Sequence, residues 1–152
     1  METTAIAFTE AERYLLQLAD KTEFDFYGLS HLDPEARRLR WIWTYGSISN
    51  KTKHIHHRIG SGITGAAIRA GRMIVLDPSH AKTEHLRSEE PVMLSESLQA
   101  AAAVVIGARN DEHGVLLVGR RKPSDFTDDE LRALQCSAVQ MSGAIHTIIC
   151  QP

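Results

Sequence analysis

The residues best placed to hold a ligand lie in segment 54–77, which reads HIHHRIGSGITGAAIRAGRMIVLD. Three of its glycines, Gly60, Gly62 and Gly65, allow positive φ angles and the close approach of another group. The apolar residues after Gly62 predict a short helix that ends at Gly71. The first N–H groups of a helix have no partner inside it and carry the positive end of its dipole. The segment therefore predicts a site for a small anion or a ligand carbonyl at the start of this helix.

The letters GSGITG also match the glycine pattern of dinucleotide-binding units, with Asp77 at the end of the following strand. A parallel crossover needs a longer helix than the residues between Gly65 and Met73 permit. The histidine-rich strand before the glycines is also unlike a strand buried on both faces. We therefore expect neither a nicotinamide nor a flavin, and no other cofactor.

A cluster of histidines, His54, His56 and His57, raises the alternative of a metal site, because imidazole is a common ligand and alternate strand residues share a face. A further ligand would have to come from His80 or His85. The spacing typical of zinc sites is absent. The favoured interpretation is an edge strand with solvent-exposed histidines and no metal.

The nucleophilic side chains are poorly placed for catalysis. Ser61 and Ser95 lack the sequence context of a nucleophile elbow. Cys136 and Cys150 fall on one predicted helix, about 21 Å apart, which is too far for a disulfide between them. No histidine adjoins either cysteine to activate it. We expect reduced, buried, structural cysteines and no catalytic residue.

The elements that position the glycine segment follow from hydrophobic periodicity. It predicts strands at 24–31, 38–45, 53–59 and 73–76, and an antiparallel hairpin of 98–108 with 114–120 at the centre of the sheet. Alternation places Trp41 and Trp43 on one face of their strand, where an indole can form the wall of an apolar pocket. The polar stretch 77–90, followed by Pro91 and a short helical turn, predicts a flap over that pocket.

Two capping boxes predict where the long helices begin. Thr9 with Glu12 predicts a helix over about 10–22, and Thr127 with Glu130 predicts the start of the last helix. The last helix carries one apolar band, Leu131, Leu134, Ala138, Met141, Ile145 and Ile148, and a second band, Ala133, Val139, Ala144 and Ile149. One band can pack on the sheet with the first helix, so the other predicts a homodimer through the terminal helices.

Length and composition exclude several classes of protein. A chain of 152 residues with 43% hydrophobic residues and a net charge of -2 is typical of one globular domain. Arg37, Arg38 and Arg40 form only a local cluster, so we expect no nucleic-acid partner. The chain has neither an apolar run that could span a bilayer nor a secretory signal at its start, so we expect a cytoplasmic protein without a membrane partner.

The order of these elements, with the G-x-G-I-x-G turn, AGRMIVLD and the apolar hairpin, resembles a GAF domain over essentially the whole chain, 1–152. The segments WIWTYGSISNKTKHIHHRIGSGITG and EEPVMLSESLQ are similar to the stand-alone nitrate-receptor GAF proteins of bacterial nitrogen regulation. The resemblance implies an α+β fold of the GAF and PAS type, with a central antiparallel sheet of about five to six strands. The terminal helices would cover one face, and a ligand pocket would lie under a loop and helix flap on the other.

The resemblance also implies which residues bind the anion. It assigns the backbone of Ile63 and Thr64 as donors, Trp41 as the wall and Val92 as the lid contact, with Trp43, Ile55, Gly62 and Pro91 as further pocket wall. Glu90 stands where those receptors are expected to have an aromatic residue, and an inward carboxylate would repel an anion.

The function implied is a small-molecule sensor, without enzymatic activity, that binds nitrate and signals to a sensor histidine kinase in two-component regulation. The alternatives are a GAF sensor for another small metabolite, such as an amino acid, and a redox or metal-dependent enzyme that uses the histidines.

Overall fold

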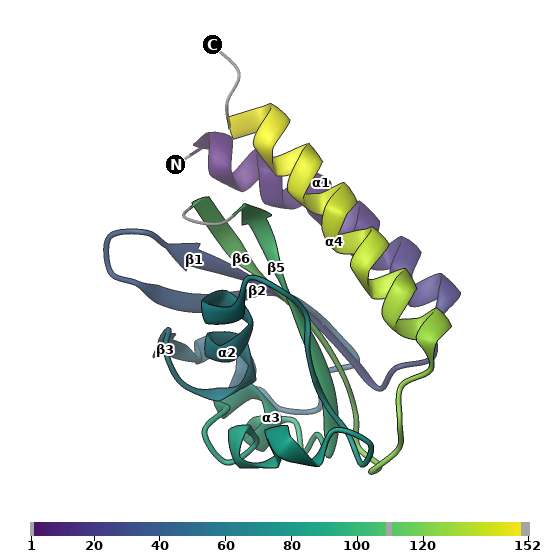
Figure 1. Ribbon diagram of the computed structural model, residues 1–152. Helices are drawn as coiled ribbons and strands as arrows, with labels where there is room; N and C mark the ends of the chain where they lie inside the picture. Colours follow the sequence, from purple (N-terminus) through teal and green to yellow (C-terminus); the bar gives the residue numbers. More distant parts are fainter. Residues whose placement is uncertain (1, 109–110, 150–152) are drawn as a thin grey trace.

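The computed structural model describes residues 2–108 and 111–149. Its centre is a six-stranded antiparallel sheet in the order β3-β2-β1-β6-β5-β4. The strands are β1 (Phe26–Asp33), β2 (Arg38–Tyr45), β3 (His56–Arg58), β4 (Ile74–Leu76), β5 (Ala100–Ala108) and β6 (Asp111–Arg120). The helices are α1 (Glu2–Lys21), α2 (Gly62–Ala70), α3 (Pro91–Ser95) and α4 (Asp128–Ile149), with 3-10 turns η1 (Thr52–His54) and η2 (Ala81–Leu86). Helices α1 and α4 lie side by side on one face, and α2 and α3 lie on the other, which confirms the predicted α+β architecture (Figure 1).

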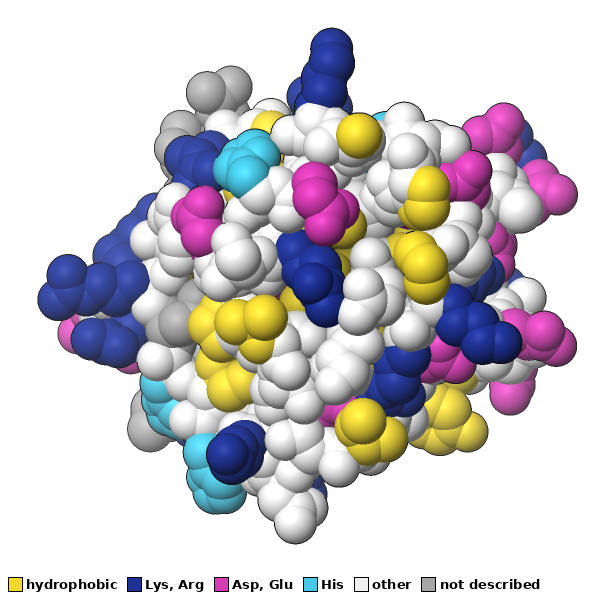
Figure 2. Space-filling view, turned by 90° about the horizontal axis from the view of Figure 1, so that it is seen from below, with side chains coloured by type: hydrophobic (Ala, Val, Ile, Leu, Met, Phe, Trp, Pro, Cys, Tyr) yellow, Lys and Arg dark blue, Asp and Glu magenta, His cyan; other side chains and the backbone are white. Residues whose placement is uncertain are grey.

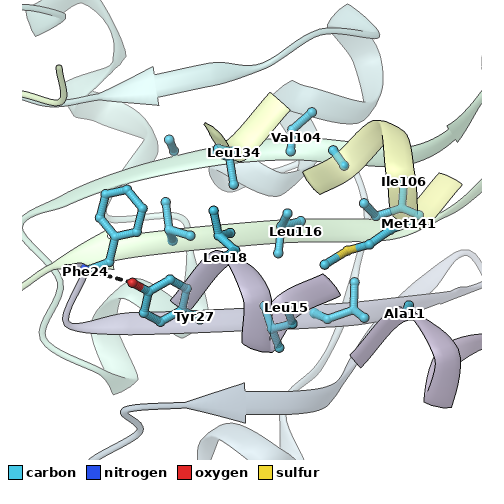
Figure 3. Packing of buried hydrophobic residues seen from close by; sticks show 14 of the residues in the cluster. Ala11, Leu15, Leu18, Phe24, Tyr27, Val104, Ile106, Leu116, Leu134 and Met141 are labelled. Atoms are coloured by element: carbon cyan, nitrogen blue, oxygen red, sulfur yellow. Dashed lines mark hydrogen bonds between the residues drawn. The ribbon is translucent and has the colours of Figure 1, made fainter. Parts of the chain in front are cut away.

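The core on the side of the long helices is built from stripes at helical spacing. Residues Ala11, Leu15 and Leu18 of α1 and Leu134 and Met141 of α4 pack against the sheet (Figure 3). The sheet contributes apolar side chains that include Tyr27, Val104, Ile106 and Leu116. The buried hydroxyl of Tyr27 accepts a hydrogen bond from the N–H of Phe24 at 3.0 Å. This packing fixes both ends of the chain to one face and leaves the other face for the site.

A second core lies between the sheet and the segment that runs from α2 to α3. Its buried members include Phe26, Leu39, Trp41, Ile63, Ala67, Leu76, Val92, Met93 and Leu98. Strand β1 is buried on both faces along most of its length, because its alternate side chains enter the two cores. The flap is thus fixed in place by apolar side chains as well as by polar contacts.

The first helix begins earlier than predicted. Helix α1 starts at Glu2, so Thr9 and Glu12 lie in its interior and do not form a capping box. Phe8, just before this pair, is buried in the core. The capping box of α4 is confirmed: Glu130 Oε1 accepts from the Thr127 N–H at 2.8 Å, and Thr127 Oγ1 accepts from the Glu130 N–H at 3.1 Å.

The strand boundaries also differ from the predicted ones. Strands 38–45 and 73–76 are confirmed to within a residue, whereas the first strand begins at Phe26 and the third only at His56, after η1. Strand β6 begins at Asp111 rather than at the predicted Gly114, which lies opposite Ile106 of β5. Residues 109–110, between these two strands, lie outside the described residues.

The prediction that both tryptophans face one way is wrong. Trp43 pairs with Leu29 and Trp41 pairs with the next residue of β1, Ser30, so β2 has a bulge at Ile42. An extra residue reverses the alternation of the side chains beyond it. Trp41 therefore enters the core on the flap side, and Trp43 packs on the side of α1, where its Nε1 donates to the Phe8 carbonyl at 3.0 Å.

Three further expectations concern cysteines, metals and membranes. Cys136 is exposed on α4, so its assignment as a buried structural cysteine is wrong, while Cys150 lies outside the described residues. Within 2–108 and 111–149, no group of three or more His, Cys, Asp or Glu side chains could hold a metal ion. No helix in the described part of the chain has the length and apolar character needed to cross a membrane.

Candidate anion site

The glycine turn builds the start of α2 as the sequence predicts. Ser61 is the extended N-cap, Gly62 has a φ of +71°, and the helix ends at Gly71 with a φ of +66°. A Cβ on Gly65 would lie 2.8 Å from the backbone of Gly60, so only glycine permits this close turn. The turn exposes the first N–H groups of α2 toward the interior, where the flap meets them.

At least one of these N–H groups already has a partner, because the carboxyl of Glu90 lies on it. The backbone N–H and the hydroxyl of Thr64 both donate to Glu90 Oε1, each at 2.8 Å. The N–H groups of Ile63 and Val92 act to lower the pKa of this carboxyl. The side chain of Glu90 is fully buried. The amide of Thr64, expected to be available to a ligand, is therefore occupied by Glu90 in this conformation.

The environment of the Glu90 carboxyl brings its titration close to neutral pH. Burial raises the pKa of Glu90 to about 7, although hydrogen bonds from Thr64, Val92 and Ile63 act in the opposite direction. Desolvation disfavours the charged form of a carboxyl, whereas N–H donors and the helix dipole favour it. For Glu90, burial therefore outweighs these hydrogen bonds, and the carboxyl titrates near neutral pH.

The predicted pocket-wall residue Gly62 lies against this carboxyl. A Cβ on Gly62 would be 2.7 Å from Glu90 Oε1 and 3.0 Å from the carbonyl of Glu89. The first distance is shorter than real Cβ contacts and the second is tighter than most of them, so the backbone at Gly62 closes the seat of the carboxyl on this side.

Trp41 supplies a polar group without a partner. It is 3% exposed and belongs to the same buried cluster as Ile63 and Val92. Its indole Nε1 is buried and has no hydrogen-bond partner among the described residues. An unsatisfied buried donor costs about 1–3 kcal/mol, so an acceptor that reached it would be stabilised.

The structure separates the other predicted wall residues from this seat. Trp43 lies on the opposite face of the sheet, so its assignment to the pocket wall is wrong. Ile55 and Pro91 line an open hollow of about 520 Å³ together with Ser49, Lys51, Leu94 and Ser95. That hollow does not include Trp41, Ile63 or Val92.

Sequence reasoning missed the residues that anchor the flap. At its start, the buried Asp77 accepts from the Phe126 N–H at 2.9 Å and contacts His80 Nδ1 at 2.6 Å. Nearby, the N–H and the hydroxyl of Ser79 both donate to Asp125, at 2.9 and 2.7 Å. These contacts join the flap to the segment that leads into α4. Only the spacing of Asp77 after the 74–76 strand drew attention to it in the sequence.

At the end of the flap, Glu96 forms the second anchor. Its buried carboxylate accepts from the Ser47 hydroxyl at 2.5 Å, the Ile48 N–H at 2.8 Å, Arg121 at 2.9 Å and the Thr52 hydroxyl. Burial raises the pKa of Glu96, but the hydrogen bonds from Ser47, Thr52 and Ile48 and the charge of Arg121 outweigh it and hold that pKa below its usual value.

Comparison with known proteins identifies the family of this chain. The family model described as GAF domain matches residues 5–146. The chain belongs to the GAF family. No curated protein matched the chain in a sequence comparison.

The solved structures similar to this chain include proteins whose descriptions name a ligand. The structure of a mutated NreA protein from Staphylococcus aureus, whose description names a nitrate binding site, is 26% identical, covers 82% of this chain and 93% of its own, and has a TM-score of 0.64. The GAF domain of an Acinetobacter phosphoenolpyruvate-protein phosphotransferase is 21% identical, with coverages of 99% and 95% and a TM-score of 0.69. A free methionine-R-sulfoxide reductase from Thermoplasma acidophilum is 16% identical, with coverages of 96% and 96% and a TM-score of 0.70. The last two show the fold alone.

Proposed function

We propose that this GAF domain is a cytoplasmic sensor for a small anion, with nitrate as the favoured ligand. The observation that supports it is that two donors of Thr64, its N–H and its hydroxyl, converge on one buried carboxyl group, whose pKa the N–H groups of Ile63 and Val92 also act to lower. A helix N-terminus that holds a carboxylate has the donors and the dipole that an external oxyanion requires. The likeness to NreA, which is described by a nitrate binding site, favours nitrate among such anions.

The sensing mechanism is an exchange of occupants. Nitrate would take the place of the Glu90 carboxyl on the N–H groups of α2 and accept the indole N–H of Trp41. The flap that carries Glu90 would then change its packing, and the contacts of Asp77 with Phe126 would pass the change to α4. A ligand shifts such an equilibrium only by its different affinity for the two states. The output would be a changed surface for a sensor histidine kinase, from a homodimer formed through α1 and α4.

This proposal assigns no bond chemistry to the protein. The reductase neighbour shares only the fold, and Cys136, the cysteine that the structure describes, is exposed on α4, across the sheet from the flap. Metal analysis of protein prepared without an affinity tag, together with the variant His56→Ala, tests the enzymatic alternative. A stoichiometric metal lost in His56→Ala would favour that alternative over the sensor.

Calorimetry with nitrate, nitrite and a panel of amino acids tests the ligand. We expect saturable nitrate binding, weakened about tenfold or more by Trp41→Phe, because that change removes one hydrogen bond to a charged group and keeps the ring. Trp43→Phe is the matched control, since it also removes an indole N–H but on the other face of the sheet. Binding of an amino acid without nitrate binding would favour the alternative metabolite sensor.

A further inference from the structure

The carboxyl group of Glu90 occupies the site in the way a bound ligand would. It is a planar group with two oxygens and is fully buried. It accepts hydrogen bonds from the N–H and the hydroxyl of Thr64, and the N–H groups of Ile63 and Val92 act to lower its pKa. In shape, the end of this side chain is an acetate group that is covalently attached to the flap. The structure therefore displays which kind of ligand the seat accepts.

We propose that Glu90 is a built-in competitor for the anion site, which an external ligand must displace, and that the ligand is a small planar oxyanion no larger than a carboxylate. The size and shape of the ligand rest on the proposed sensor function, whereas the competition by Glu90 concerns the chain alone. Nitrate, nitrite, formate, acetate and bicarbonate belong to this class, and sulfate and phosphate do not.

The size limit follows from the close walls of the seat. The backbone at Gly62 lies so near Glu90 Oε1 that an added Cβ would be 2.7 Å away. A tetrahedral anion such as sulfate carries oxygens on both sides of the plane that a carboxylate occupies, so it needs more room than a carboxylate beside the close backbone at Gly62. It also carries a second charge, and taking a second charge out of water adds to the cost of burial.

Competition of this kind couples the ligand to a proton. The N–H and the hydroxyl of Thr64, which donate to this carboxyl, do not themselves titrate near neutral pH. In its seat, Glu90 has a pKa raised by burial to about 7, and after displacement into water it regains the ordinary value of 4.5. Between these two values, displacement releases a proton, so nitrate affinity should rise about tenfold per pH unit and level off above pH 7.

The variant Glu90→Ala tests the competitor directly, because it removes a fragment equivalent to acetate and leaves the donors in place. We expect acetate, formate and nitrate to raise its thermal midpoint saturably at pH 8, and sulfate to have no such effect. Nitrate should bind Glu90→Ala at least tenfold more tightly than the unmodified protein at pH 6. Glu89→Ala is the matched control, since it removes the neighbouring exposed carboxylate and should behave like the unmodified protein.

The outcomes separate the competitor from the sensor. A folded Glu90→Ala protein that takes up none of these anions, or binds nitrate no better than the unmodified protein, overturns the competitor. If Glu90→Ala binds acetate but the unmodified protein binds no nitrate at any pH, the proposed nitrate-sensing function is overturned. The proposal that Glu90 competes for the site is then retained. If Glu90→Ala does not fold, Glu90→Gln provides the test. The nitrate affinity of Glu90→Gln should not vary between pH 5 and 7. If the affinity of this variant rises with pH as steeply as that of the unmodified protein, the proposal is contradicted.

Discussion

Two buried glutamates flank the short helix α3, and their surroundings move their pKa values in opposite directions. Glu90 accepts from the N–H and the hydroxyl of Thr64, and burial dominates, so its pKa is raised to about 7. Glu96 is buried too, but the hydroxyls of Ser47 and Thr52, the Ile48 N–H and the charge of Arg121 hold its pKa below the usual value. The same residue type thus serves as a proton-sensitive group at one end of α3 and as a permanent anion at the other.

Glu90→Gln should make the protein less sensitive to pH. Because the folded state holds the Glu90 proton more tightly than the unfolded state, its stabilising contribution is complete below pH 4.5 and is lost as pH rises through 7. The shift corresponds to about 3 kcal/mol. Relative to the variant, the unmodified protein should therefore lose about 3 kcal/mol of unfolding free energy from about pH 4 to about pH 8, measured by urea denaturation.

Glu96→Gln provides the comparison with the opposite sign. A depressed pKa stabilises the folded state above the unfolded value and loses this contribution as pH falls through the folded value. The variant should be less stable than the unmodified protein at pH 7, and the deficit should shrink in acid. Equal pH profiles for the two variants would contradict the assignment of opposite surroundings.

At the scale of elements, the sequence predicts best where one local rule decides the structure. The Thr127–Glu130 box and the Gly71 cap are both local, and both are confirmed. The Thr9–Glu12 box fails because helix α1 runs through it from Glu2, and Ala7 and Phe8, just before the box, are already buried. A local cap signal cannot show that a tertiary contact upstream extends the helix.

The features that could not be predicted depend on contacts between distant segments. The bulge at Ile42 reverses the direction of Trp43, and it is set by pairing with β1 and by the bond from Trp43 to Phe8. The GAF resemblance located the donors of Ile63 and Thr64, but periodicity does not reveal that Glu90, 26 residues further on, lies on them. The direction of a side chain in a flap depends on the final packing rather than on its neighbours in the sequence.

The turn into α2 can be tested with two glycines that share a backbone conformation. Gly62 and Gly71 both have positive φ, so alanine at either costs roughly 1–2 kcal/mol. Nothing lies within 4 Å of a Cβ at Gly71, whereas a Cβ at Gly62 meets Glu90 Oε1 at 2.7 Å. Gly62→Ala should therefore destabilise the protein by more than Gly71→Ala in thermal or urea unfolding.

A double variant assigns this difference. In a Glu90→Ala background, the excess cost of Gly62→Ala over Gly71→Ala should decrease, because the carboxyl that meets the new Cβ is gone. The part that remains measures the contact with the Glu89 carbonyl. An excess cost that is unchanged in the double variant would mean that the carboxyl does not press on this turn.

At the scale of the whole molecule, charge is unevenly distributed. Figure 2 shows Lys and Arg side chains gathered on the side where the β1–β2 hairpin lies in Figure 1. Across the register of β2 and β3, Arg38 lies opposite Arg58 and Arg40 lies opposite His56. Like charges directly opposite one another destabilise a strand pair and also repel a second copy of the same edge. This edge is therefore a poor surface for self-association, which leaves the face of α1 and α4.

That face carries the exposed apolar residues expected of a dimer surface: Ile6 and Leu16 on α1 are 56% and 47% exposed, and Val139 on α4 is 62% exposed. If two copies pack through these helices, Val139→Glu and Leu16→Glu should each convert a dimer to a monomer in sedimentation velocity, because a buried charge without a partner is costly. Ile48→Glu is the matched control, since Ile48 is 66% exposed on the loop after β2 and should leave the dimer intact. Loss of the dimer in the control, or a monomer in the unmodified protein at every concentration tested, would contradict this interface. Because the anion seat lies across the sheet, nitrate affinity should be retained in Val139→Glu, and its loss would mean that the seat is complete only in the dimer.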